Sequence, residues 1–249
     1  MIYTSDLLTT NDMRTLLGKI NTGLESIEFS ISDNLDLLDS KIIEYRKKLD
    51  FLNVTNLTIH GPFLDLNPAS YDSQIREVTF HRFSQSYEAA LLLGAKKIIF
   101  HTCFIPTIYF PDEWPERMAD FWNDFLKDRQ QIPVLMENVY DPYPEPIRKV
   151  KDLVNASNFM LCLDIGHVNC YSKLSVLEWI CCLDDAIDHV HLHDNDGTRD
   201  AHLALGEGSL PVHEVIEALK KAAPTATYTI ECAAPQAVLD SYEMIRCRL

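Results

Sequence analysis

The stretch that decides the fold is Phe159–His167, FMLCLDIGH. It is an apolar run of strand length that carries an acid, Asp164, and an imidazole, His167, at its end. In a parallel α/β barrel, a buried strand delivers such side chains from its C-terminal end to the active site. The same layout recurs at five other places in the chain, and this recurrence favours a catalytic barrel.

Strand-like apolar runs alternate with helical segments along the whole sequence. The predicted strands are Met1–Ser5, Ser26–Ile31, Asn56–His60, Lys97–His101, Pro133–Glu137, Phe159–His167, His189–His193 and Tyr228–Glu231. The predicted helices are Asn11–Ile20, Asn34–Phe51, Ser73–Leu93, Glu116–Gln130, Pro146–Asn155, Val176–Leu183, Val212–Ala222 and Gln236–Arg248. This alternation implies a parallel sheet covered by helices. Eight such units in 249 residues predict an α/β fold, a single (β/α)₈ TIM barrel over residues 1–249.

The acidic net charge of the chain restricts the kinds of molecule that it is expected to bind. The formal net charge is −15, and a protein that tracks a nucleic-acid backbone needs clustered Lys and Arg instead. The same charge disfavours binding to an anionic membrane surface, and no apolar run approaches membrane-spanning length. We therefore expect a small-molecule substrate, no nucleic acid and no membrane, and we leave a homo-oligomer open.

The expected compartment is the cytoplasm. The N-terminal sequence MIYTSDLLTT lacks the basic and apolar regions of a signal peptide. The seven cysteines are odd in number and include no Cys-x-x-Cys pair, which favours reduced thiols.

Imidazoles and carboxylates occupy the C-terminal ends of six consecutive predicted strands and the loops after them. They are His60, His101, Glu137, Asp164, His167, His191, Asp200, His202 and Glu231. A single His at a strand end is more often a hydrogen-bonded structural residue than a ligand. Six strands in a row are hard to explain in that way, because converging carboxylates need cations to stay ionised together. These residue types suit zinc, manganese and iron.

The seventh strand offers two candidate ligands. His189, His191 and His193 share one face, since side chains alternate along a strand. His189 is expected deeper in the barrel and His193 beyond the strand end. We prefer His191 for its position and keep His193 as the alternative.

Seven sequence pieces, in order, carry a family resemblance. They are HGPF at His60, FHTC at His101, MEN at Glu137, LDIGH at Asp164–His167, HLHDN at His191, DAHLALGEG at Asp200–Gly208, and IE at Glu231. With these pieces the chain resembles the xylose isomerase-like TIM barrel superfamily, and within it the AP endonuclease family 2 grouping. They cover the third to the eighth strand, which is most of the chain.

The resemblance implies metal sites. In the sugar isomerases and epimerases, the matching residues Glu137, Asp164, His191 and Glu231 would hold one divalent ion, Mn, Mg, Fe or Co. In the endonuclease IV branch, up to three Zn ions would be held. His60, His101 and Glu137 match the first site, Glu137, Asp164, His191 and Glu231 the second, and His167, Asp200 and His202 the third. The chain has a candidate at all nine positions.

Two mechanisms are compatible with these residues. In the first, a metal cluster activates water and stabilises the attacking and leaving oxygens of a phosphoester. The filled nine-residue set favours it, and the acidic chain favours a small phosphodiester over DNA. The superfamily includes cobamide-remodelling phosphodiesterases, and such a substrate would suit the aromatic loop Phe104–Trp114. In the second, Glu137 and Glu231 act as acid and base on a metal-bound sugar or sugar phosphate, which is isomerised or epimerised.

Three residues are predicted to bind the substrate. Arg199 lies beside Asp200 and would contact a phosphate, whereas Tyr109 and Trp114 would cover the substrate. Gly206 and Gly208 are expected to allow positive φ angles near the metals. A non-catalytic metal-binding or scaffold protein is a third hypothesis, which the intact ligand set disfavours.

Overall fold

A computed structural model describes residues 1–248, so Leu249 of the predicted domain lies outside the described residues. Eight parallel strands form one closed barrel in chain order, and β1 pairs with β8 to complete the ring. The strands are β1 Ile2–Ser5, β2 Gly23–Ser26, β3 Leu57–His60, β4 Ile98–His101, β5 Val134–Glu137, β6 Phe159–Asp164, β7 Ile187–Leu192 and β8 Thr227–Ile230. The prediction of a single (β/α)₈ TIM barrel is confirmed.

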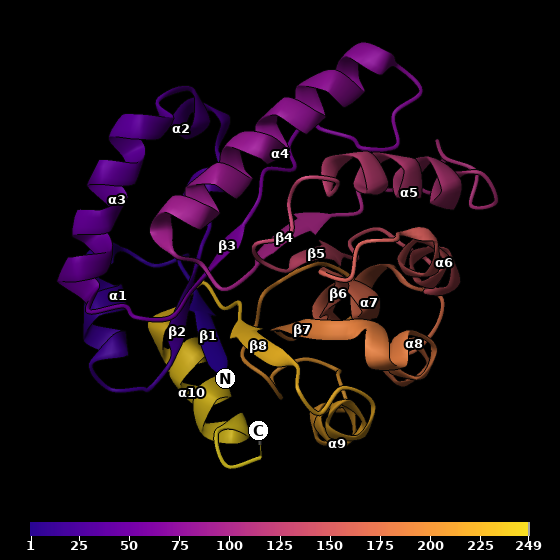
Figure 1. Cartoon of the computed structure of the whole chain (residues 1–249). Helices are drawn as coiled ribbons and strands as arrows, with labels where there is room; N and C mark the ends of the chain where they lie inside the picture. Colours follow the sequence, from indigo (N-terminus) through magenta and orange to yellow (C-terminus); the bar gives the residue numbers. More distant parts are fainter. Residues whose placement is uncertain (249) are drawn as a thin grey trace.

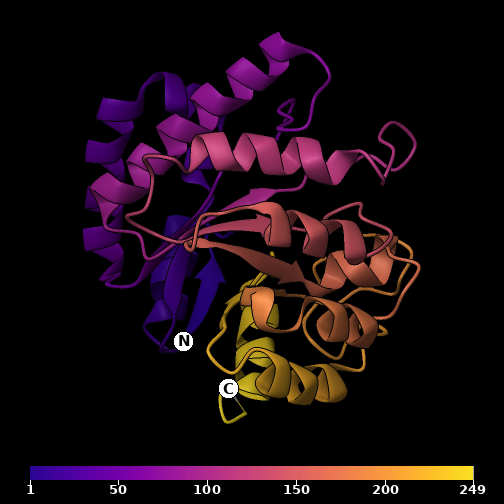
Figure 2. The same cartoon turned by 45° about the vertical axis from the view of Figure 1, so that its right-hand side comes forward.

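Helices surround the barrel (Figure 1). They are α1 Thr10–Leu17, η1 Glu28–Ser30, α2 Ser32–Asp36, α3 Leu38–Leu52, α4 Ser73–Leu93, α5 Trp114–Phe125, α6 Glu145–Leu153, α7 Ile165–Tyr171, α8 Val176–Leu183, η2 Asp184–Ala186, α9 Val212–Ala222 and α10 Pro235–Ile245. In Figure 2 the magenta helices and the orange and yellow helices lie on opposite sides of the strands.

The side chains of each strand alternate between two cores. On β4, Ile98 and Phe100 pack outward against the helices, whereas Ile99 packs inside the barrel against Leu135 and Cys162. The outer core is rich in aromatic rings, and Phe100 lies 4.1 Å, centroid to centroid, from Phe83. Burial of one such side chain stabilises the fold by about 2–3 kcal/mol. The alternation also turns the last residue of β4, His101, toward the barrel axis.

The predicted second strand, Ser26–Ile31, is wrong. The strand is Gly23–Ser26, and Glu28–Ser30 forms a 3₁₀ turn. Gly23 permits this register, because a Cβ there would lie 2.4 Å from the Tyr3 ring and 2.8 Å from the Asn56 carbonyl oxygen. The shift places Glu25 inside the barrel, where it is fully buried.

Two further predictions need correction. The helix predicted over Asn34–Phe51 is split at Leu37 into α2 and α3. The sixth strand ends at Asp164, and His167 lies in the first turn of α7. The Asp164 carboxylate caps this helix, since its Oδ1 accepts a hydrogen bond of 2.6 Å from the His167 amide.

The helices predicted over Ser73–Leu93, Val176–Leu183 and Val212–Ala222 have these bounds in the structure. All seven cysteines are free thiols. Among residues 1–248, no helix has both the length and the apolar character that a membrane span requires.

Candidate metal centre

The nine predicted ligands meet at the C-terminal end of the barrel. A cavity of about 310 Å³ opens there. Seven of the nine line it, namely His60, His101, Glu137, His167, Asp200, His202 and Glu231. Asp164 and His191 lie beneath them and are 0% exposed. A larger groove of about 530 Å³ lies between α4 and α5, and its lining contains none of the nine.

His60, His101 and Glu137 form a first cluster. The two Nε2 atoms are 3.0 Å apart, and they lie 3.3 Å and 3.6 Å from Glu137 Oε2. Ligand atoms that each bond a zinc ion at about 2.0–2.2 Å stand about 3.0–3.6 Å from one another. The three atoms therefore have the spacing that one divalent ion requires.

A second cluster surrounds His191. Its Nδ1 lies 3.1 Å from Glu137 Oε1, 3.6 Å from Glu231 Oε1 and 3.8 Å from Asp164 Oδ2. Glu137 thus directs one oxygen to each of the first two clusters, which is the arrangement of a bridging carboxylate. Glu137 Oε2 and His191 Nδ1 are buried without a hydrogen-bond partner. Because buried polar atoms are costly when unpaired, this donor set fits a cation.

His167, Asp200 and His202 form a third cluster. Asp200 Oδ2 lies 3.3 Å from His167 Nε2 and 3.2 Å from His202 Nε2. His202 has a φ of 47°, which is rare for a residue other than glycine. Each of these two distances matches the spacing of neighbouring ligands around one ion, and His193 Nδ1, which lies 3.5 Å from Asp200 Oδ1, borders the same cluster.

Three imidazoles are oriented by backbone carbonyls. The Nδ1–H groups of His60, His167 and His202 donate to the oxygens of Gly61, Asn138 and Glu231 at 2.9, 2.9 and 2.6 Å. Each Nε2 consequently faces the carboxylate of its cluster. Metal-ligating histidines are held in this way, because the outer hydrogen bond fixes the tautomer and the ring.

Burial and neighbouring carboxylates shift the pKa values of the imidazoles in different directions. Burial lowers the pKa of His202, but the hydrogen bond with Asp200 and the charge of Glu231 outweigh it and raise this pKa to about 9. Burial likewise opposes charging of His167, yet Asp164 and Asp200 raise its pKa well above the usual value. The pKa of His101 is instead lowered to about 3, chiefly by burial.

We expect metal binding to release protons. An ion must displace the proton that His202 carries below its pKa of about 9, so affinity should rise by about tenfold per pH unit as the pH rises toward 9. The raised pKa of His167 acts in the same direction. Calorimetric titration with Zn²⁺ in buffers of different ionisation enthalpy measures the number released. A binding heat that is independent of the buffer would contradict the assignment.

His191 and His193 have different neighbours. His191 faces Glu137 and Glu231, whereas His193 Nε2 lies 3.1 Å and 3.2 Å from the two oxygens of Asp164. The His193 ring stacks on His202 at a centroid distance of 4.0 Å. Gly166 makes room for it, since a Cβ there would lie 2.0 Å from the ring. His191 therefore lies with Glu137 and Glu231, as preferred, whereas His193 lies with Asp164 and Asp200 and is also placed to hold an ion.

Asp194 organises the loop after β7. Its carboxylate is 0% exposed and accepts hydrogen bonds from the backbone amides of Asn195, Gly206, Gly208 and Leu210 at 2.8–3.2 Å. This network holds the segment that carries Asp200 and His202. The expected positive φ is present at Gly206, at 88°, but the expectation is wrong for Gly208, which is required for close packing instead.

Gly208→Ala should destabilise the protein by about 1–3 kcal/mol, as overpacking does. A Cβ at this position would lie 2.2 Å from the Asn195 carbonyl oxygen and 2.3 Å from Asp194 Oδ1. Gly18→Ala is the matched control, because its Cβ would have only ordinary contacts of 3.5 Å or more. Chemical denaturation measures the free energy of unfolding of both variants. A Gly208→Ala variant as stable as the Gly18→Ala control would contradict the prediction, because the loop would then accommodate the extra methyl group without strain.

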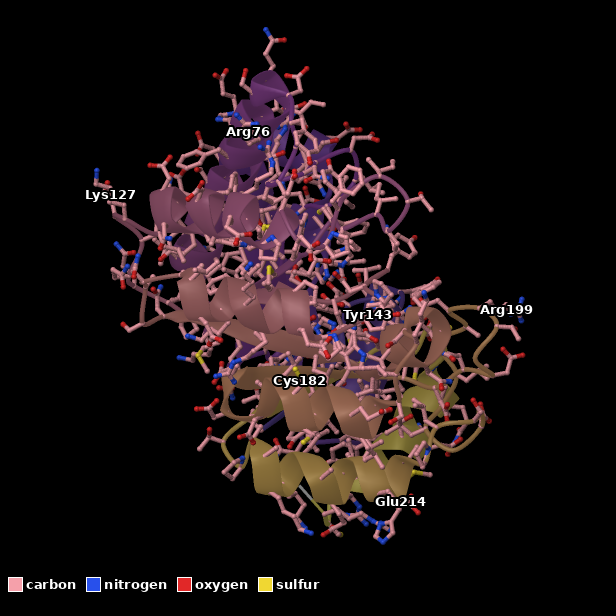
Figure 3. The ribbon with its side chains drawn as sticks, turned by 90° about the vertical axis from the view of Figure 1, so that its right-hand side faces the viewer. Arg76, Lys127, Tyr143, Cys182, Arg199 and Glu214 are labelled. Atoms are coloured by element: carbon pink, nitrogen blue, oxygen red, sulfur yellow. The ribbon has the colours of Figure 1, made fainter. Side chains whose placement is uncertain are left out.

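The predicted substrate residues are not brought to the cavity. Trp114 is 1% exposed and packs edge-on against Phe104 at 5.3 Å, and the Tyr109 hydroxyl accepts a hydrogen bond from Asn67. Figure 3 shows Arg199 at the outer edge of the molecule, on the exposed loop after β7. These side chains pack the β4–α5 loop or face solvent.

Other aromatic rings line the cavity, and sequence reasoning did not identify them. They are Phe63, Tyr140 and Tyr171. Phe63 stacks on His101 at 4.3 Å, and Tyr140 contacts Tyr171 edge-on at 4.9 Å. Phe63 and Tyr140 lie in the loops after β3 and β5, whose conformation no periodic pattern specifies, and Tyr171 is the last residue of α7.

Comparisons with known proteins agree with this geometry. The family described as "Xylose isomerase-like TIM barrel" matches residues 20–247. An uncharacterized protein of Methanocaldococcus jannaschii is 26% identical over 217 residues, which cover 81% of this chain and 72% of the relative. A "Probable endonuclease 4" of Mycobacterium leprae is 27% identical over 202 residues, which cover 75% and 78%.

A solved structure described as a "D-tagatose 3-epimerase-like protein" shares the fold. It superposes with a TM-score of 0.83 at 24% identity and covers 99% of this chain and 96% of its own.

Proposed function

The chain belongs to the xylose isomerase-like TIM barrel family, and on this premise we propose that it hydrolyses a small phosphodiester at a centre of up to three divalent metal ions, expected to be zinc. One observation carries the proposal. His60, His167 and His202 are fixed by backbone carbonyls with Nε2 toward Glu137 or Asp200. A single-metal sugar enzyme needs no such ligands in the first and third clusters.

Each cluster would hold one ion. His60, His101 and Glu137 would hold one ion, Glu137, Asp164, His191 and Glu231 the next, and His167, Asp200 and His202 the third. Such ions act as Lewis acids that activate water and neutralise charge on phosphoryl oxygens. Glu231 borders the cavity, so its carboxylate faces both the middle site and a bound substrate.

The cavity and the charge favour a small substrate. A volume of about 310 Å³ suits a compact ligand, and the net charge of −15 opposes a nucleic-acid backbone. The similarity to a relative named as an endonuclease 4 supports phosphodiester hydrolysis by this chain. We propose a small phosphodiester, and not DNA, as the substrate.

The test is hydrolysis of bis(p-nitrophenyl) phosphate by protein of known metal content. We expect p-nitrophenolate release that stops on chelation and returns with zinc. Absence of hydrolysis of this and of small natural phosphodiesters by the three-metal protein would overturn the proposal.

Sugar or sugar-phosphate epimerisation or isomerisation is the second candidate. It is favoured by Glu137 and Glu231, which approach His191 Nδ1 at 3.1 Å and 3.6 Å from β5 and β8. Two carboxylates flanking one ion suit proton removal and return at carbon. The likeness to the epimerase-like structure supports it. Solvent deuterium that enters a ketose at carbon would favour this reaction over hydrolysis.

A further inference from the structure

Glu25 is a buried carboxylate beneath the metal centre, outside the cavity lining. It lies on β2 and is 0% exposed. Thr58 and Thr229 donate hydroxyl hydrogen bonds of 2.9 Å and 2.8 Å to its Oε2. These two contacts, from β3 and β8, fix the plane of the carboxylate and leave Oε1 directed to one neighbour.

That neighbour is His191. Its Nε2 lies 2.9 Å from Glu25 Oε1, and its Nδ1 faces Glu137 at 3.1 Å on the opposite side of the ring. The ring is completely buried, and its other polar neighbours are Asp164, Glu231 and the Cys162 thiol. The orientation of the His191 ring therefore depends on Glu25 at Nε2 and on the residues of the metal centre at Nδ1.

The rest of the network anchors Glu25 to the barrel floor. His189 Nε2 lies 3.2 Å from Glu25 Oε2, and both His189 ring nitrogens are also hydrogen-bonded to threonine hydroxyls. Thr227, one of these threonines, accepts a hydrogen bond of 2.9 Å from Lys97, which in turn pairs with Asp188 at 2.6 Å. His189 is thereby held in the barrel interior by Glu25 and two threonines.

We propose that Glu25 is the positioning residue of the middle ion: it holds the His191 proton on Nε2 and turns Nδ1 toward Glu137, Asp164 and Glu231. The inference rests on the metal centre of the proposed function, but not on the identity of the substrate. A carboxylate behind a ligating histidine strengthens the ligand, and loss of such a partner typically weakens metal binding about 10–100-fold.

Glu25→Gln keeps the shape of the side chain and removes its charge. We expect the middle ion to be bound about 10–100-fold more weakly, while the two outer ions stay. Competition with a chromophoric chelator measures the affinities, elemental analysis counts the ions, and the visible absorption of the Co²⁺-loaded protein reports the changed coordination. Glu28→Gln is the matched control, because Glu28 lies three residues further on and its carboxylate accepts a hydrogen bond of 3.0 Å from Asn34.

The outcomes separate positioning from a structural role. A purely structural role would lower the melting temperature of the chelator-treated protein and weaken all ions alike, and such a result overturns the proposal, as does a competition curve equal to that of the wild type. If Glu25→Gln does not fold, Glu25→Asp withdraws the carboxylate from His191 and serves the same test. If the wild type binds one ion only, the three-ion proposal fails, yet the same variant still tests Glu25 on that ion.

Discussion

Glu137→Gln should lower the rate of phosphodiester hydrolysis by roughly 10³-fold or more. Oε2 of Glu137 faces His60 and His101, and Oε1 faces His191. Replacement of the carboxylate by an uncharged amide therefore weakens the binding of two ions. Two bound ions supply several kcal/mol of charge stabilisation in the transition state, and each 1.36 kcal/mol corresponds to a tenfold change in rate. Steady-state kinetics with bis(p-nitrophenyl) phosphate measure the loss.

The control for this variant is Glu145→Gln. Glu145 begins α6 at an exposed position, so its replacement changes the net charge equally without contact with the centre. Metal content should fall from three ions toward one in Glu137→Gln and stay unchanged in the control. Full activity of Glu137→Gln would contradict the bridging role.

The double variant His167→Ala/His202→Ala should lose the third ion and, with it, hydrolysis by roughly 10²-fold or more. Both Nε2 atoms face Asp200, and without them one carboxylate is left to hold the ion. The four residues around the middle ion remain, so single-metal proton transfer at carbon should survive. This variant therefore discriminates between the two candidate reactions.

His81→Ala/His213→Ala is the matched control, because both of these histidines are exposed on helices far from the cavity lining. Elemental analysis and hydrolysis assays are run on both double variants. Hydrolysis that persists at the wild-type rate in His167→Ala/His202→Ala would remove the third ion from the mechanism.

The barrel could be predicted from the sequence because its signals are strong and local. Strands such as Lys97–His101 are short apolar runs that end in a polar residue. The helix over Ser73–Leu93 ends at Gly94, whose φ of 72° favours glycine. The second strand failed because Ile27, Phe29 and Ile31 alternate like a strand, although pairing with β1 and β3 uses Gly23–Ser26.

The predicted ligands meet because parallel strands of a barrel all end on one face. The residues that complete the site were less predictable. Glu25 was missed because the register of its strand was predicted wrongly. Phe63 and Tyr140 come from loops, and Tyr171 comes from the end of α7. Trp114 and Tyr109 were expected at the substrate because aromatic loops often cover active sites, but their side chains pack into the β4–α5 region instead.

The central claim is a centre that binds three ions, and the metal content of protein purified without chelator or added metal tests it most directly. Elemental analysis should find close to three zinc ions per chain, with the third absent from His167→Ala/His202→Ala. One loosely held manganese or magnesium ion per chain would contradict the claim and leave the epimerase chemistry of Glu137 and Glu231 as the better account.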